Sequence, residues 1–401
     1  MGFIEVAWIP KYGGTFVLKI ALSTLCENPE RKTGLTSLFH EFVKYGLKEE
    51  SDVEWLIFAG PDQEWEVGND DPRVKVVRKY AANNKLVKRL AAEHLFVGAT
   101  ARQAGADVLM TTGFVPRRTG GLPVVMQLLT LHFLDPVGNG MGWMKARYRK
   151  NAVLNGLDRA ALIITNTKSA ESQILGCAPS VKSKLVQSYE GLQRETFHPS
   201  APKNERSDLL ERFGVEPGYL FWCSNFYPYK QVDKFLAAYA ELSREERRRL
   251  PVVMVGGGNW GEGIDEAMEI AKTLGVREHI NHFGWVADAD LPMLYRQAKM
   301  FCLASREETF GRCVLEAMAC GTPCVVNGIP VMEEVTNGSA LIVDFSNRRE
   351  ACDAFRRLLE DEALAEKLSR EGIEQSKGFD FSILARERIG AIRAMLTARN
   401  N

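Results

Sequence analysis

Short apolar runs alternate along the whole chain with longer stretches in which apolar residues recur every three or four positions. The first kind of segment predicts buried strands, and the second predicts amphipathic helices with one apolar face. Short strands separated by helices are typical of parallel sheets joined by crossover helices. The pattern therefore predicts an α/β protein with two doubly wound sheets, which would face each other across a cleft.

The predicted strands fall into two groups, one in each half of the chain. They are 3–9, 53–60, 74–77, 107–112, 123–131 and 161–167, then 219–225, 251–257, 280–285, 300–305, 323–328 and 340–345. Between the groups, residues 188–208 are rich in Pro, Ser and charge, which favours a domain boundary there. We predict domains at 1–195 and 205–380, with the helical segment 381–401 joining the first.

Composition narrows the range of partners. The 401 residues include 51 basic and 51 acidic side chains, so no net charge attracts the chain to nucleic acid or a membrane. No apolar run approaches the ~18 residues of a membrane-spanning helix, and the N-terminus lacks the layout of a signal peptide. Eight cysteines are scattered without a C-x-x-C pair, which favours reduced thiols in a cytoplasmic protein.

The stretch EETFGRCVLEAMACGTPCVV, residues 307–326, carries the most specific chemistry. It follows a predicted strand, and residues 312–320 predict a helix that ends before Gly321 and Pro323. Glu308 then lies in a loop at the carboxyl edge of the sheet, and Glu316 lies in the second helical turn. Ligands of doubly wound sheets bind at this edge.

Polar groups of this stretch suit a sugar nucleotide. The backbone N–H groups of Phe310, Gly311 and Arg312 point out of a helix N-terminus, where anionic oxygens bind. A carboxylate accepts hydrogen bonds from adjacent hydroxyls, so Glu316 suits a ribose diol and Glu308 a sugar hydroxyl. The alternative is a pair of solvated glutamates on a buried helix, which the position after a strand disfavours.

The stretch SREETFGRCVLEAMACGTPCVV resembles the Glu-x7-Glu signature of retaining nucleotide-sugar transferases of the GT-B fold, in particular glycosyltransferase family 4. The resemblance continues in NHFGWVADADLPMLYRQAKMFCLAS before the signature and in VMEEVTNGSALIVDF after it, where Glu334 takes the family's recurrent Glu-Val position. SNFYPYKQVDKFLAAYAEL resembles its phosphate-binding Lys loop. The N-terminal half resembles the family loosely, through Gly13-Gly14 and LLTLHFLD.

The resemblance implies two Rossmann-like domains and assigns roles to individual residues. Glu316 would hold the nucleotide ribose, and Glu308 would contact the donor sugar. Lys230 would neutralise the diphosphate leaving group. The remaining members of the implied site are Gly13 and Gly14, with amides for the phosphates, His132, against the transferred sugar, and the donor-binding positions Asn225, Phe310, Gly311 and Arg312.

Two positions depart from the family pattern. Asn225 stands where the family usually has an Arg five residues before the Lys, so one cation for the phosphates is missing. Phe133, rather than an acidic residue, follows His132, which leaves a structural histidine at a strand end as the alternative.

Two further motifs have simpler interpretations. The stretch GGGNWG, residues 256–261, fits a dinucleotide fingerprint, but no acidic residue ends the next predicted strand. In the Asp-Ala-Asp triplet at 288–290, Asp290 is predicted to cap a helix with Pro292 in its first turn. We therefore expect neither a nicotinamide cofactor nor a required metal.

Residues 78–95 predict a basic helix with Leu86, Leu90 and Ala91 on one face. Such a helix is either solvated or in contact with the surface of a membrane. Peripheral contact at the inner membrane face would suit an enzyme with a lipid-linked acceptor.

The predicted function is transfer of a sugar from a nucleoside-diphosphate sugar to a hydroxyl of a saccharide or lipid-linked acceptor, with retention, in cell-surface polysaccharide or glycolipid synthesis. No nucleic acid takes part. The alternatives are a nucleotide-sugar epimerase or hydrolase of the same fold, and a non-catalytic relative that binds sugars or partners.

Overall fold

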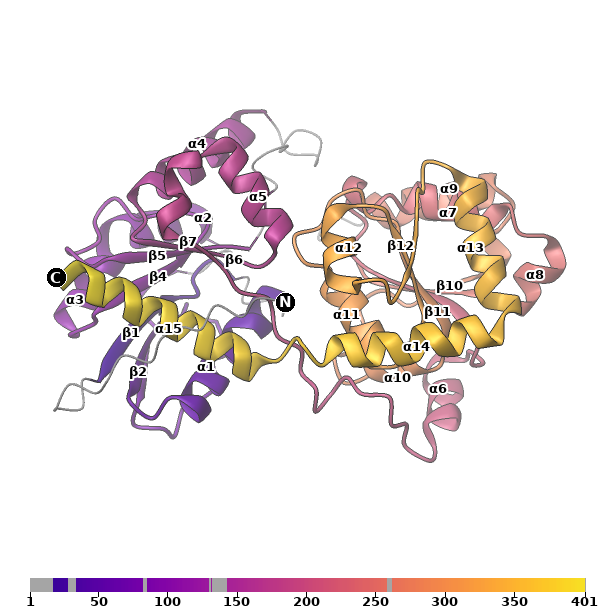
Figure 1. Ribbon diagram of the computed structural model, residues 1–401, viewed down its shortest axis with the longest axis horizontal. Helices are drawn as coiled ribbons and strands as arrows, with labels where there is room; N and C mark the ends of the chain where they lie inside the picture. The colour runs from indigo at the N-terminus through magenta and orange to yellow at the C-terminus, as the bar shows by residue number, and fades with distance from the viewer. Residues whose placement is uncertain are drawn as a thin grey trace. The chain divides into compact units, whose positions relative to one another are not determined.

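The computed structural model describes residues 17–27, 34–81, 85–129, 131, 143–257 and 262–400. Their strands form two sheets, each accompanied by helices (Figure 1). The predicted fold class of two parallel-sheet α/β domains is therefore confirmed. The chain forms two compact units, residues 1–125 and 126–401, and the division falls inside a strand. The domain limits 1–195 and 205–380 remain a prediction.

The N-terminal sheet has the strand order β3-β2-β1-β4-β5-β6-β7. Its strands are β1 (Leu18–Ser23), β2 (Val53–Phe58), β3 (Val74–Val77), β4 (Val108–Thr112), β5 (Val124–Leu128), β6 (Leu162–Thr165) and β7 (Leu185–Gln187). The pairs of β1 with β2 and β4, of β2 with β3, and of β6 with β7 are parallel. The strand order reverses between β1 and β4, which makes that edge the switch point of the sheet.

Helices connect these strands along the chain. They are α1 (Gly34–Glu49), α2 (Leu86–Ala92), the π-helical turn η2 (Glu93–Val97), α3 (Gly98–Gln103), α4 (Trp143–Arg159), α5 (Lys168–Cys177) and the 3₁₀ segment η3 (Pro179–Lys184). The helix predicted over 78–95 is wrong at its start, because residues 78–81 are not helical and Tyr80 is buried. Of the residues predicted on its apolar face, Leu86 and Ala91 are exposed and Leu90 is half-buried.

The sequence prediction missed β1, an interior strand of the sheet. Residues 18–23 are almost wholly buried and pair with both β2 and β4. Lys19 interrupts the apolar run and forms an ion pair with Glu54 on β2, with Nζ and Oε2 2.8 Å apart. The strand predicted over 3–9 lies outside the described residues.

The C-terminal sheet has the strand order β10-β9-β8-β11-β12-β13, and every neighbouring pair is parallel. Its strands are β8 (Tyr219–Cys223), β9 (Val252–Val255), β10 (Ile280–His282), β11 (Ala298–Leu303), β12 (Cys324–Asn327) and β13 (Leu341–Val343). Each lies within or beside a predicted strand. The switch point of this sheet lies between β8 and β11.

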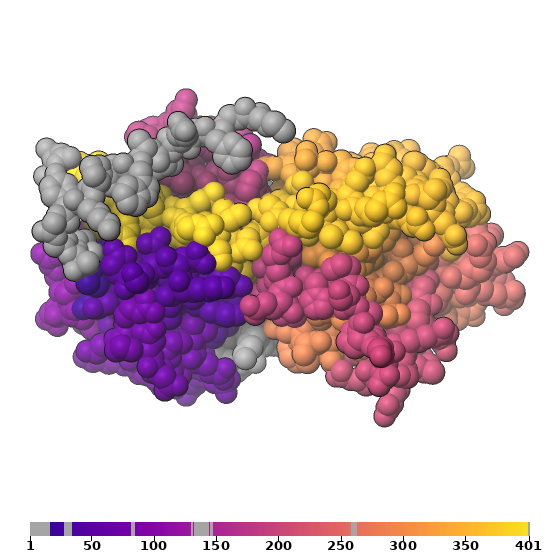
Figure 2. Space-filling view, turned by 60° about the horizontal axis from the view of Figure 1, so that its bottom comes forward, coloured from indigo at the N-terminus to yellow at the C-terminus, as the bar shows by residue number. Residues whose placement is uncertain are grey.

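The helices of this half include long amphipathic ones and short turns. They are α6 (Glu205–Phe213), the 3₁₀ turn η4 (Pro228–Lys230), α7 (Val232–Ala240), α8 (Arg244–Arg249), α9 (Glu262–Thr273), η5 (Arg277–His279), α10 (Leu291–Arg296), α11 (Arg312–Ala319), α12 (Pro330–Thr336), α13 (Arg348–Glu360), α14 (Glu362–Ser376) and α15 (Phe381–Asn400). The helices α14 and α15, yellow in Figure 2, form part of the molecular surface.

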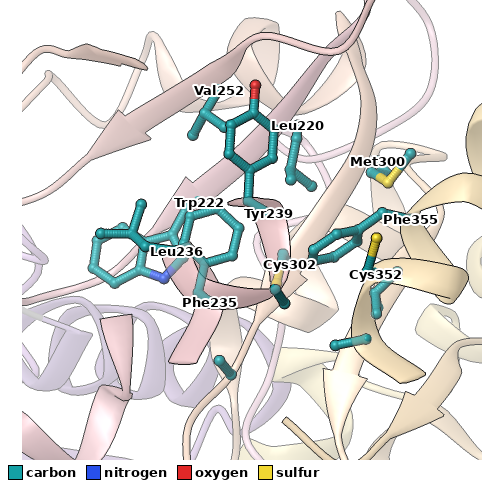
Figure 3. Close-up of a cluster of buried hydrophobic side chains, with 14 of the residues drawn as sticks. Leu220, Trp222, Phe235, Leu236, Tyr239, Val252, Met300, Cys302, Cys352 and Phe355 are labelled. Atoms are coloured by element: carbon teal, nitrogen blue, oxygen red, sulfur yellow. The ribbon is translucent and has the colours of Figure 1, made fainter. Parts of the chain in front are cut away.

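Alternate residues of β8 face two different hydrophobic clusters, as a sheet covered on both faces requires. Leu220 and Trp222 pack with residues of α7 and α13 (Figure 3). Residues of α9 belong to the same cluster. Tyr219 and Phe221 pack with residues of α10, α11 and α12. Full burial of each such side chain contributes about 2 kcal/mol. The two clusters therefore hold the switch point in a fixed place.

Candidate active site at the switch point of the C-terminal sheet

Lys230 and Glu308 meet at the switch point. Lys230 ends the turn η4 after β8, and Glu308 lies in the loop after β11. Nζ of Lys230 lies 2.5 Å from Oε1 of Glu308, and both side chains are about 10% exposed. Burial disfavours the charged form of Lys230. The Glu308 carboxylate and other neighbouring groups favour the charged form more strongly, so the pKa of Lys230 lies above its usual value. The lysine is therefore charged.

The backbone after Lys230 is bent sharply. Gln231 has φ +51°, a left-handed conformation that is uncommon for a residue other than glycine. Nζ of Lys230 lies 5.1 Å from the ring centre of Tyr229, and the carbonyl of Tyr229 accepts a hydrogen bond from the Arg306 amide at 2.9 Å. These contacts fix the ammonium group beside the loop that carries Glu308.

Phe310 and Gly311 lead into α11, which starts at Arg312 as predicted. The Phe310 side chain is buried against Phe379, so its amide is the part that faces a ligand in our hypothesis. Gly311 has φ +87°, and a Cβ atom there would lie 2.3 Å from Cε of Met332. The left-handed backbone is the main reason for a glycine here, because the end of the flexible Met332 side chain could turn away.

Glu316 lies on α11 and is held by a buried tyrosine. The Tyr295 hydroxyl donates a hydrogen bond to Oε2 of Glu316 at 3.0 Å. Burial raises the pKa of the Glu316 carboxyl to about 7, although Arg312 and the Tyr295 hydrogen bond oppose the shift. Glu316 therefore changes its charge close to neutral pH.

Arg312, the first residue of α11, is also paired with a carboxylate. Its Nη2 atom lies 3.0 Å from Oε2 of Glu190, and the other oxygen of Glu190 accepts a hydrogen bond from Asn166 at 2.8 Å. Asn225, which occupies the family's usual Arg position, is exposed. Arg312 is thus the cation nearest to the α11 N-terminus in sequence.

Two cysteines belong to the same neighbourhood. Burial raises the pKa of the Cys223 thiol to about 12, and it raises that of Cys313 well above its usual value. Both thiols therefore stay protonated at neutral pH and are poor nucleophiles. All eight cysteines are free, as the sequence analysis expected.

Several predicted site residues lie outside the described residues. These are Gly13, Gly14 and His132. Residues 258–261 of the glycine-rich stretch, which is not part of the predicted site, also lie outside them. Asp290 is the N-cap residue of α10 and Pro292 lies in the first turn, as predicted, but the Asp290 side chain makes no capping hydrogen bond. Its two oxygens instead bind Arg212, each at 2.6 Å, which satisfies a carboxylate that is 7% exposed.

Sequence reasoning missed Tyr295 and Glu190. Tyr295 belongs to the apolar stripe of α10, where an aromatic residue normally indicates core packing. Glu190 lies in the segment interpreted as a domain linker. Glu334 was noted only for the family resemblance, yet it accepts hydrogen bonds from the amides of Lys168 and Ser169 at 2.7 and 2.9 Å. It thereby caps the N-terminus of α5.

The comparisons with known proteins agree with this geometry at the level of fold and class. The fold is that of GT-B glycosyltransferases: sucrose-phosphate synthase from Thermosynechococcus elongatus superimposes with a TM-score of 0.79 at 18% identity, over 95% of this chain and 100% of that one. Anabaena HepE in complex with UDP and glucose superimposes with a TM-score of 0.71 at 16% identity, over 94% of this chain and 99% of that one.

Sequence comparison points to the same class. Residues 211–375 match the family model described as Glycosyl transferases group 1. The O-antigen chain mannosyltransferase B of Escherichia coli is 27% identical over 253 residues. This alignment covers 63% of the chain and 65% of the relative, less than two thirds of that protein's length. The family match thus includes Lys230, Glu308, Arg312 and Glu316.

Proposed function

We propose that the protein is a retaining glycosyltransferase of family 4 that transfers a hexose-type group from a nucleoside-diphosphate sugar to a hydroxyl acceptor. The observation that carries the proposal is the charged pair of Lys230 and Glu308 at the switch point, beside Glu316 and the N-terminus of α11. This pair lies inside the segment that matches the group 1 family model. HepE, a protein of the same fold, has been solved with UDP and glucose.

In the proposed reaction the enzyme stabilises the charges that develop as the bond to the leaving group breaks. As the bond between the anomeric carbon and the phosphate oxygen breaks, the sugar gains positive charge and the diphosphate gains negative charge. Lys230 and the backbone amides at the start of α11 stabilise the leaving diphosphate. Glu316 accepts hydrogen bonds from the ribose hydroxyls, and Glu308 contacts the donor sugar. The electrostatic stabilisation is the largest contribution in this scheme.

Retention requires the acceptor to approach the face from which the diphosphate departs. In the proposal the departing phosphate takes the proton of the acceptor hydroxyl, so no enzyme nucleophile is needed. The high pKa values of the Cys223 and Cys313 thiols support a scheme without a thiolate nucleophile. Gly13 and Gly14 at the phosphates and His132 at the sugar complete the hypothesis, and no metal is required in it.

The experiment that tests this proposal has two stages. Thermal unfolding is measured with uridine, guanosine and adenosine diphosphates and with the matching nucleosides. At least one diphosphate should raise the midpoint where its nucleoside does not, because a ligand of the folded state stabilises it. The matching sugar nucleotide and a hydroxyl acceptor are then incubated with the protein, and NMR of the product should show the donor's anomeric configuration. An inverted product, or sugar released to water at the same rate without acceptor, would overturn retention or transfer respectively.

The structure supports a proposed site of membrane contact in the N-terminal half. Four large apolar side chains on α2 and η2 are exposed: Leu86, Val87, Leu95 and Phe96. Lys85 and Lys88 flank them and are exposed as well. An apolar patch beside cations suits the surface of an anionic bilayer. We therefore propose a cytoplasmic enzyme of glycolipid or polysaccharide synthesis in peripheral contact with the membrane. Among the described residues, no helix is both long and apolar enough to cross a bilayer.

Vesicle co-sedimentation tests this contact. The double variant Lys85→Glu/Lys88→Glu should lose most of its binding to vesicles rich in phosphatidylglycerol, and Phe96→Ser should lose part of it. Arg89 is left unchanged, because its Nε atom lies 3.3 Å from the buried Glu93 carboxylate. A double variant with the same change of charge on other elements, Lys44→Glu/Lys75→Glu, is the control. Equal sedimentation of all variants would end this part of the proposal.

A further inference from the structure

Both cations of the candidate site are already paired with carboxylates. Lys230 is paired with Glu308 at 2.5 Å, and Arg312 is paired with Glu190 at 3.0 Å. A diphosphate that enters this site meets two cations whose charge is already compensated. Glu308 belongs to the loop assigned to the donor sugar, whereas Glu190 comes from a separate segment after β7. The role of Glu190 therefore needs its own explanation.

The backbone on both sides of Glu190 is held firmly. The ring of Tyr189 packs edge-on against Phe379 with centres 5.3 Å apart, and the Leu192 amide donates to the Phe379 carbonyl at 3.1 Å. At Gly191, a Cβ atom would lie 2.5 Å from the ring of Phe381. The side chain of Glu190 is thus presented from a fixed position.

The two oxygens of Glu190 have different partners. Asn166 donates to Oε1 at 2.8 Å, and Arg312 donates to Oε2 at 3.0 Å. A second guanidinium, that of Arg388 on α15, is fully buried and donates to Gln127 at 2.9 Å. Burial lowers the pKa of Arg388 to about 10, and the charge of Glu190 opposes this shift. Glu190 therefore interacts electrostatically with two arginines.

We propose that Glu190 is an internal competitor for Arg312, which the diphosphate of the donor displaces. In the free protein, Glu190 compensates the charge of Arg312 at the start of α11. When the diphosphate binds, its oxygens replace the Glu190 carboxylate on Arg312, and Glu190 keeps its hydrogen bond with Asn166 and its electrostatic interaction with Arg388. This inference rests on the proposed function, because it names the anion that takes the place of Glu190.

How much Glu190 weakens binding of the diphosphate depends on how deeply the pair of Arg312 and Glu190 is buried. The Arg312 and Glu190 side chains are 20% and 11% exposed, so solvent screens their interaction only partly. Removing one partner of such a pair leaves the other charge uncompensated, and an anionic ligand then relieves that cost. Glu190→Gln keeps an oxygen for Asn166 but offers no charge to Arg312. We expect it to tighten binding of the diphosphate about tenfold, an amount in the range of charge-assisted contacts.

The experiment is isothermal titration calorimetry on the full chain. The probe is whichever of uridine, guanosine and adenosine diphosphate stabilises the wild type most, and its nucleoside is titrated in parallel. Glu190→Gln should bind the diphosphate about tenfold more tightly and the nucleoside with unchanged affinity. Unchanged or weaker binding of the diphosphate would overturn the inference. A wild type that binds none of the three diphosphates would instead contradict the proposed function.

Two further variants isolate the contact. In an Arg312→Gln background, Glu190→Gln should no longer change diphosphate affinity, because the two residues act through one interaction. A remaining tenfold gain in that background would show that Glu190 acts elsewhere. Glu216→Gln is the matched control, since Glu216 pairs with Arg206 at the same distance of 3.0 Å on the exposed surface. Glu216→Gln should change neither the affinity for the diphosphate nor the affinity for the nucleoside.

Discussion

The strand order reverses between β8 and β11 in the C-terminal sheet and between β1 and β4 in the N-terminal sheet. At the first reversal, Lys230 and Glu308 form a pair of opposite charges 2.5 Å apart. At the second, Glu27 follows β1 and is 6% exposed. Burial raises the pKa of Glu27 to about 8, and a hydrogen bond with Thr36 opposes the shift. At neutral pH this carboxyl is therefore mostly protonated.

Glu93, a second buried acid of the N-terminal half, also has a raised pKa. Glu93 lies on the π-helical turn η2 and is 2% exposed. Burial raises its pKa, although Arg89 and the Ser23 hydroxyl, which donates to Oε1 at 3.1 Å, oppose the shift. The comparison teaches that topology fixes where polar groups gather, whereas burial and partners decide whether they carry charge. One switch point holds an ion pair, whereas the buried Glu27 at the other is mostly neutral at pH 7.

The largest expected effect concerns the charged switch point. Lys230→Ala should lower the turnover number about a hundredfold or more, as when another stabiliser of developing negative charge is removed. Initial rates of sugar transfer measure this, with Lys234→Ala on the exposed face of α7 as the control. Thermal midpoints are recorded for both variants, because the Lys230 variant leaves Glu308 without its cation. A fall of less than fivefold in a folded variant would remove the leaving-group role.

The protonation of Glu27 should make the free energy of unfolding depend on pH. The folded-state pKa of Glu27, about 8, lies above its unfolded value, so the folded state binds this proton more tightly. Stability is then lost as pH rises, by about 2 kcal/mol between pH 6 and pH 8. Urea unfolding of the full chain measures this loss, which Glu27→Gln should largely abolish and Glu64→Gln should not. The same loss in wild type and Glu27→Gln would contradict the assignment.

A third prediction concerns Glu316. In the proposed function its carboxylate form accepts hydrogen bonds from the ribose hydroxyls, and burial raises its pKa to about 7. Diphosphate affinity should therefore rise between pH 6 and pH 8 and level off above it. Glu316→Gln should bind about tenfold more weakly at pH 8, the magnitude of a charge-assisted hydrogen bond. The phosphate of the ligand also titrates, but this affects wild type and Glu316→Gln alike. The measurement is therefore the ratio of the wild-type affinity to the Glu316→Gln affinity at each pH. A ratio independent of pH would count against the ribose role.

The smallest expected effect belongs to Tyr295→Phe. The Tyr295 hydroxyl donates to Glu316 and lowers the pKa of its carboxyl. Without it, the midpoint of the pH dependence should move upward, and affinity at pH 7 should fall about threefold, in line with one lost hydrogen bond. The phenyl ring keeps the aromatic packing with Phe221 and Phe301. A change of affinity without a shift of the midpoint would mean that Tyr295 acts through packing.

The C-terminal half could be predicted well from sequence, and for a physical reason. Continuous apolar runs between glycines and helical stripes mark buried parallel strands, and residues that follow such strands converge at one edge. That logic places Glu308 and Glu316 at one edge of the sheet, whereas Lys230 is assigned only through the resemblance of its loop to the family's Lys loop. In the N-terminal sheet it failed for β7 and for β1, where Lys19 breaks the apolar run.

Side-chain partners were harder to foresee than strands. Asp290 was assigned to a helix cap because of its place before Pro292, yet a cation from α6 determines where its oxygens point. Glu190 carries no local signal, because its partners Asn166 and Arg312 are distant in the chain. Such contacts depend on which elements pack together, and no spacing rule encodes them.

Gly311 restricts how this site can vary. Asparagine often replaces glycine in left-handed backbone positions, since its short side chain tolerates them. Here the Cβ atom of a side chain would also lie 2.3 Å from Cε of Met332, so the methyl end of that flexible side chain would have to turn away. A replacement must therefore accept a left-handed backbone and be short enough for the space that Met332 can yield. Asparagine meets the first condition best, so few residue types suit the start of α11.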